Sequence, residues 1–170
     1  SDLVIGADGS HSKLRRDAGF KVKNLGAPMD VLWFKLSYRA EQHHVVLGRI
    51  DAGQALVMLD RGDYWQCACV IPKGGYAEVR DAGLSALRQG VGAVAPFLAD
   101  RTGELRAWDD VKLLTVRVNR LQRWHRPGLL CIGDATHAMS PVGGVGINLA
   151  IQDAVAAANL LAPRLRSGAL

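Results

Sequence analysis

The chain has 170 residues, which is enough for one domain or for two small lobes that share a sheet. Hydrophobic residues make up 49% of it, so it can bury a core, and no apolar run reaches the roughly 18 residues that span a bilayer. The formal net charge of +5 is spread over segments 13–16, 117–126 and 164–166 without an aromatic ladder. That pattern disfavours nucleic-acid binding and leaves a solvated basic surface or an attraction for phosphate-bearing cofactors.

The first element expected along the chain is a short apolar strand at residues 3–5, which runs into the turn Gly6-Ala7-Asp8-Gly9. Ser10 or Ser12 can cap a helix that continues to about residue 18, where Gly19 would end it. The chain starts on this strand without an initiator Met or a signal region, so we expect it to be cut from something longer.

Residues 29–71 predict an antiparallel sheet of about four strands. Apolar and polar residues alternate from Leu32 to Tyr38, and similar runs at 44–50, 54–59 and 64–71 are separated by turns at 51–53 and 60–63. The large aromatic residues of this segment are expected to be mostly core, with a substrate pocket as the alternative: Trp33, Phe34, Tyr64 and Trp65.

The three cysteines form no CxxC pair and have no histidine at metal-ligand spacing. Cys67 and Cys69 are two apart in an expected strand, so their side chains share a face, and Cys131 lies in a strand that reads as buried. The pattern predicts reduced thiols in a cytoplasmic protein and no metal site.

Helices are expected at 76–89 and 91–99, followed by strands at 111–118 and 129–132, and by a last helix at 145–162 that Pro163 closes. The apolar stripe of that helix consists of Ile147, Ile151, Ala154, Val155, Ala158 and Leu161. The predicted fold class is therefore α/β with an α+β insert. Residues 1–28 and 110–170 form one Rossmann-like layer, and residues 29–109 project from it as an antiparallel lobe. Both glycine turns of the layer follow strands, at the edge where open α/β sheets bind ligands.

The turn after the strand at 129–132 combines an acid with a glycine-rich entry into a helix. Gly133 lets the backbone turn tightly, and Asp134 can accept hydrogen bonds from the hydroxyls of a sugar-like chain. The following run, Pro141-Val142-Gly143-Gly144-Val145-Gly146-Ile147-Asn148, removes side chains from the helix start, where free N–H groups and the helix dipole favour negative charge. A glycine-rich turn with an ordinary cap is the plainer interpretation. The fixed order of acid, His137, proline, glycines and asparagine between a strand and a helix disfavours it.

This segment resembles the second flavin-binding motif of the para-hydroxybenzoate hydroxylase-like family of flavoprotein monooxygenases. The resemblance implies that Gly133 and Asp134 lie at the ribityl chain of FAD, with Asp134 on its 3′-hydroxyl, and that Pro141 lies near the reacting face of the isoalloxazine. It also implies that His137 orders the loop rather than shuttling protons, and that Asp153 serves helix packing. The backbone amides expected at the pyrimidine edge are those of Gly144, Val145, Gly146, Ile147 and Asn148.

The first turn resembles the same family's Asp-Gly motif, Asp-Gly-x-x-Ser-x-x-Arg. Asp8, Gly9, Ser12 and Arg15 occupy its fixed positions. By itself an Asp-Gly turn is common, but here it precedes the second motif by roughly 120 residues, in the family's order. The resemblance implies that Asp8 and Gly9 lie near the FAD pyrophosphate, that Arg15 organises the turn, and that the motif takes part in the use of the nicotinamide cofactor.

One part of the family's pattern has no counterpart in this sequence. The Gly-x-Gly-x-x-Gly fingerprint that holds the ADP half of FAD does not occur. We therefore expect a fragment that exposes an apolar sheet surface and does not bind FAD tightly on its own.

The resemblance implies an NAD(P)H-dependent monooxygenase that hydroxylates an aromatic or polyketide-like substrate with dioxygen through a flavin C4a-hydroperoxide. NAD(P)H would bind transiently as the reductant, and no side chain of this segment needs to be catalytic. Two alternatives stay open. One is an FAD-dependent halogenase or isoprenoid-chain reductase, and the other is a non-catalytic fragment that binds no flavin.

Overall fold

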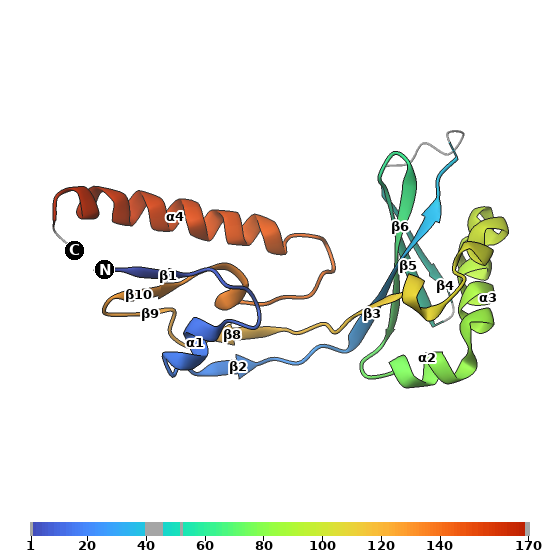
Figure 1. Ribbon diagram of the computed structural model, residues 1–170, viewed down its shortest axis with the longest axis horizontal. Helices are drawn as coiled ribbons and strands as arrows, with labels where there is room; N and C mark the ends of the chain where they lie inside the picture. Colours follow the sequence, from blue (N-terminus) through green and yellow to red (C-terminus); the bar gives the residue numbers. More distant parts are fainter. Residues whose placement is uncertain (1, 40–45, 52, 169–170) are drawn as a thin grey trace. The chain divides into compact units, whose positions relative to one another are not determined.

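The computed structural model describes residues 2–39, 46–51 and 53–168. The chain divides into two compact units, Ser1–Ala27 with Arg117–Leu170 and Pro28–Val116 (Figure 1). Unit 2 runs on to Val116, past the expected boundary at residue 109, because β7 (Lys112–Leu114) pairs with β3 (Met29–Ser37).

Unit 1 contains a small sheet, a two-stranded ribbon and two helices. β1 (Val4–Gly6) pairs in parallel with β10 (Leu129–Cys131), and β9 (His125–Arg126) pairs antiparallel with the other side of β10. β2 (Val22–Asn24) and β8 (Asn119–Leu121) form the ribbon. The helices are α1 (Lys13–Asp17) and α4 (Gly146–Arg166), and a single 3-10 turn spans Gly133–Ala135. Leu121, Cys131 and Ala135 form a buried hydrophobic cluster in this unit.

Unit 2 is a five-stranded antiparallel sheet in the order β4-β5-β6-β3-β7, with β4 (Val46–Asp51), β5 (Gln54–Asp60) and β6 (Tyr64–Pro72). Helices α2 (Tyr76–Ala82) and α3 (Leu84–Val94) follow, with 3-10 segments at Pro96–Glu104 and Trp108–Asp110. Leu32, Phe34 and Leu36 pack with Leu87 and Val91 of α3, so the helical layer covers one face of the sheet (Figure 1).

The predicted fold class is confirmed, and so are the long strands of the insert. Several predicted elements are wrong in detail. The helix expected at 76–89 is broken at Gly83, whose φ of +89° suits glycine, and α3 then continues to Val94. The strand expected at 111–118 is present only as β7 (Lys112–Leu114), because residues 115–118 are irregular and the next strand, β8, starts at Asn119 in another sheet. The part of the expected strand 44–50 that precedes residue 46 lies outside the described residues.

Helix α4 departs from the prediction in its end and in its packing. It continues through Pro163 to Arg166, because a proline near the end of a helix removes only one of the last hydrogen bonds. Its predicted apolar stripe is largely exposed, with Ile147, Ile151 and Val155 at 69%, 55% and 54%. On the edge strand β1, Val4 and Ile5 are also exposed, as the sequence led us to expect. No helix in the described ranges is both long and apolar enough to cross a membrane.

Candidate functional site

The two turns singled out in the sequence lie at the same edge of one sheet. Because β1 and β10 are parallel and paired from Val4↔Leu129 to Gly6↔Cys131, both strands end at the same level. The N–H of Ile132 donates to the carbonyl of Gly6 at 2.9 Å, which extends the pairing by one step. The segment after Gly6 and the turn after Ile132 therefore start side by side.

Arg15 joins these two turns through its buried guanidinium. Nη1 donates to the carbonyl of Ala135 at 3.1 Å and to Asn119 Oδ1 at 3.4 Å, and it lies 3.5 Å from the carbonyl of Asp134. Nη2 donates to the carbonyl of Ser10. The side chain that the sequence assigned to one turn thus connects it with the second turn and with β8.

Asp8 is engaged at the start of α1. Its Oδ2 accepts the N–H groups of Lys13 at 2.8 Å and Leu14 at 3.1 Å. The Ser12 hydroxyl and these N–H groups hold the pKa of Asp8 below its ordinary value, against the opposing effect of burial. Ser12 caps the helix by accepting the N–H of Arg15 at 3.0 Å, as predicted, and Gly9 has a φ of +79°. This carboxylate therefore orders its own turn.

The turn at Gly133–Ala135 is held from within, while its acid is left open. The Gly133 carbonyl accepts the N–H groups of Thr136 and His137 at 2.8 and 3.0 Å and the Thr136 hydroxyl at 2.7 Å. The Asp134 side chain is exposed, and no residue in the described part of the chain hydrogen-bonds to its carboxylate. An uncommitted carboxylate on an ordered turn is suited to accept hydrogen bonds from a ligand's hydroxyl groups.

The glycine-rich loop enters α4 without a side-chain cap. Gly143 and Gly144 have φ of +83° and +64°, and a Cβ built on either would meet open space. The N–H of Gly144 donates to the carbonyl of Pro141 at 3.0 Å, which closes a turn. The first N–H groups of a helix have no partner within the helix. Here the N-cap residue is Val145, whose side chain has no acceptor, so no side chain caps these N–H groups. Together with Asp134, these uncapped amides and open glycines fit the ribityl and pyrimidine parts of a flavin.

A pair of residues that sequence reasoning did not connect lies beneath this turn. Asp153 Oδ2 is 2.6 Å from His137 Nε2 and also accepts the N–H of Gly133 at 2.8 Å. The family resemblance implied helix packing for Asp153, and the sequence left His137 without a partner. Their separation of 16 residues across a loop carries no periodic signal that would pair them.

Two of the four large aromatic residues that were expected to be mostly core are buried in unit 2. Phe34 and Trp65 are buried in the core, whereas Trp33 and Tyr64 are half-buried. Trp33 lines a groove of about 400 Å³ together with Lys35, Gln66 and Lys112. Burial raises the pKa of Cys67 to about 12 and that of Cys69 to about 11, so both thiols stay protonated at neutral pH.

Comparison with known proteins gives consistent relatives. A family described as FAD binding domain matches residues 1–169. The curated 6-methylpretetramide 4-monooxygenase of Streptomyces rimosus is 38% identical over 168 residues, which cover 98% of this chain and 40% of that protein. The structure of PqsL from Pseudomonas aeruginosa in complex with 2-aminobenzoylacetate has a TM-score of 0.78 at 26% identity and covers 98% of this chain and 47% of PqsL.

A flavin-dependent halogenase, CmlS, has a TM-score of 0.76 at 21% identity and covers 98% of this chain and 31% of its own. At that identity the likeness shows the fold alone. The chain thus spans less than half the length of each of these relatives.

Proposed function

This chain belongs to the family of FAD binding domains, and we propose that it supplies the segment of an FAD-dependent monooxygenase that holds the ribityl chain and pyrimidine edge of the flavin. The observation that carries the proposal is the Asp134 carboxylate, uncommitted within the described residues, on the turn that precedes an uncapped, glycine-rich helix start. A carboxylate for hydroxyl groups and free amides for a negatively charged ring edge are the two kinds of partner that a flavin needs there.

Each part of the site has a separate task in this proposal. Asp134 accepts a hydrogen bond from the ribityl hydroxyl, and Pro141 lies along one face of the ring. Negative charge on the ring is stabilised by the backbone amides of Gly144, Val145, Gly146, Ile147 and Asn148. Bound FAD supplies the redox chemistry. Gly9 and Asp8 shape the turn beside the pyrophosphate, and Arg15 fixes that turn to the second one. The chain's own contribution is binding and orientation, with no side chain acting as acid or base.

For the whole protein we propose NAD(P)H-dependent hydroxylation of an aromatic or polyketide-like small molecule with dioxygen. Two relatives support this: one is a 6-methylpretetramide 4-monooxygenase, and the other is PqsL, whose crystal structure contains 2-aminobenzoylacetate. In unit 2, the half-buried indole of Trp33 in its groove is a surface against which an aromatic ring could stack. The unpaired cysteines Cys67, Cys69 and Cys131 fit a reducing compartment such as the cytoplasm.

The proposal predicts that Asp134→Ala weakens FAD binding by the complete protein about 10- to 100-fold, the range for losing a hydrogen bond to a charged group. A titration of the apoprotein with FAD, followed by flavin fluorescence, measures the dissociation constant. Because the Asp134 side chain is exposed, the stability of the FAD-free protein should change little.

The matched control is Asp17→Ala, which removes an exposed carboxylate of α1 in the same unit. An Asp134→Ala protein that binds FAD as tightly as the Asp17→Ala protein would remove Asp134 from the flavin site.

A further inference from the structure

The His137–Asp153 contact lies between the two parts of the proposed flavin site. Asp134 is on the turn that follows β10, whereas the amide donors are on the first turn of α4. We propose that His137 and Asp153 are a positioning pair that fixes the Asp134 turn on helix α4 in the geometry that binds FAD. This inference rests on the function proposed above.

The pair holds both ends of the turn with one oxygen atom. Asp153 Oδ2 accepts the N–H of Gly133, the first residue of the turn, at 2.8 Å, and it contacts Nε2 of His137, just beyond its end, at 2.6 Å. An ionised carboxylate only accepts hydrogen bonds, so Nε2 is the protonated nitrogen and donates. Asp134 lies inside the segment that these two bonds enclose.

Packing around the pair restricts it further. The side chains of His137 and Asp153 are only 18% and 17% exposed, so their charge-assisted bond is partly shielded from water. The ring of Trp124 packs on His137 with centroids 5.2 Å apart. Ala150 lies three residues before Asp153, on the same face of α4. It is so close to Gly133 that a Cβ added to Gly133 would lie 3.2 Å from the Cβ of Ala150. The turn therefore contacts the helix in two ways, by the close packing of Gly133 on Ala150 and by the hydrogen bonds of Asp153.

The His137–Asp153 pair links the Asp134 turn to the start of α4, two binding elements that the chain separates by a glycine-rich loop. The loop contains Gly143 and Gly144, so it does not by itself fix the distance between Asp134 and the helix start. Asp153 is on α4, the helix that provides the amide donors, and it hydrogen-bonds to the turn that carries the Asp134 carboxylate. The pair acts through these groups and not on the flavin directly.

The test is a double-mutant cycle for FAD binding in the complete protein. His137→Phe keeps a ring against Trp124 and removes the donor, so we expect the FAD dissociation constant to rise about tenfold. In an Asp134→Ala background the same substitution should change it by less than about threefold, because the group being positioned is gone. His137→Gln, which retains a donor amide, should recover most of the affinity, and His125→Phe is the control at an exposed histidine.

A second readout separates positioning from general stability. At saturating FAD, His137→Phe should alter the visible circular dichroism of the flavin, whereas a variant that is merely less stable would regain the wild-type spectrum. If His137→Phe does not fold, the cycle is run with Asp153→Asn, which keeps an acceptor for Gly133 and loses the charge.

Each outcome decides between the proposals. Effects of His137→Phe and Asp134→Ala that multiply in the double mutant, with a wild-type flavin spectrum, would overturn the positioning role and leave the flavin site standing. An unchanged dissociation constant for Asp134→Ala alone would overturn the flavin role of Asp134, and the positioning role with it.

Discussion

Replacing Arg15 by alanine is expected to lower the free energy of unfolding of unit 1 by about 3–5 kcal/mol, the cost of breaking a buried charged network. Arg15 is only 8% exposed, and its guanidinium donates to the carbonyl of Ala135, to Asn119 Oδ1 and to the carbonyl of Ser10. Alanine would leave these acceptors without a donor in a place that water hardly reaches. Hydrogen exchange followed by mass spectrometry measures the loss as faster exchange in segments 8–19 and 129–137, with unit 2 as the internal reference.

Arg16→Ala is the matched control, because Arg16 is its neighbour on α1, but its side chain is 70% exposed and pairs with the exposed Asp17 at 3.5 Å. A surface pair of this kind contributes about 0–1 kcal/mol. Arg15→Lys should fall between the two, since an ammonium on a flexible stem cannot donate to carbonyls on two turns in the planar arrangement of a guanidinium. If the amides of unit 1 exchange as slowly in the Arg15→Ala protein as in the Arg16→Ala protein, the two turns are not joined by this side chain.

Sequence patterns predicted the elements whose environment imposes a period. The strands from Met29 to Pro72 have one face on the helical layer, so every second residue is apolar and the alternation from Leu32 to Tyr38 identifies them. β2 and β9 are too short to show any period, and both were missed. Their position depends on partners in β8 and β10, which lie far away or across a turn.

Periodicity also identified the apolar face of α4 without saying what packs on it. Ile147, Ile151 and Val155 do follow helical spacing, yet each is more than half exposed. A hydrophobic stripe shows which side of a helix avoids water, and the covering surface is a separate fact that no local pattern contains.

The candidate site was predictable where one short segment determines it. Ser12, Gly9 and the glycines before α4 have their conformations dictated by capping and by positive φ, so their roles can be read locally. The contacts of Arg15 with Asn119 and Ala135 cross more than 100 residues and follow only from the parallel pairing of β1 with β10. The sequence also left His137 without its partner Asp153, because a separation of 16 residues across a loop carries no periodic signal.

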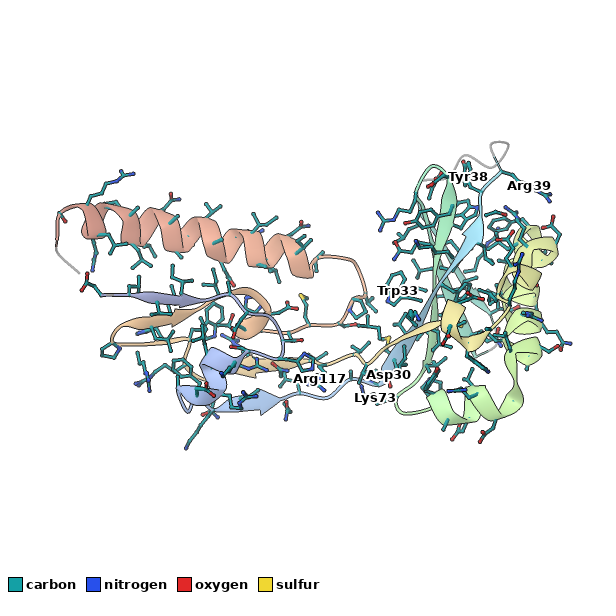
Figure 2. All side chains as sticks on the ribbon, in the orientation of Figure 1. Asp30, Trp33, Tyr38, Arg39, Lys73 and Arg117 are labelled. Atoms are coloured by element: carbon teal, nitrogen blue, oxygen red, sulfur yellow. The ribbon has the colours of Figure 1, made fainter. Side chains whose placement is uncertain are left out.

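In unit 2, Asp30→Ala is expected to lower the free energy of unfolding by about 3–4 kcal/mol, since it removes a buried hydrogen-bonded charge. Asp30 is 3% exposed, and its carboxylate accepts three donors: the Lys73 ammonium at 2.7 Å and the N–H groups of Val116 at 2.9 Å and Gly74 at 3.0 Å (Figure 2). Lys73 and Gly74 lie in the turn after β6, and Val116 is the last residue of the unit. The carboxylate on β3 thus fixes the turn after β6 and the segment after β7 just beyond the residues that the strand ladders pair, and urea unfolding followed by far-UV circular dichroism measures its contribution.

The effect also has a predicted pH dependence. Burial alone would raise the pKa of Asp30, but the Lys73 ammonium and the two N–H groups outweigh it and hold the pKa below the ordinary value. A carboxyl with a depressed pKa stabilises the folded state fully above its unfolded pKa of about 3.9, and that stabilisation is lost as the pH falls through the lower folded value. The difference in stability between the wild type and Asp30→Asn should therefore be constant from neutral pH to about pH 5 and shrink below it. Asp109→Ala, at an exposed position of the same unit, should leave both the stability and its pH profile unchanged. A wild-type advantage over Asp30→Asn that persists undiminished to about pH 2 would show that the ionised carboxylate is not its source.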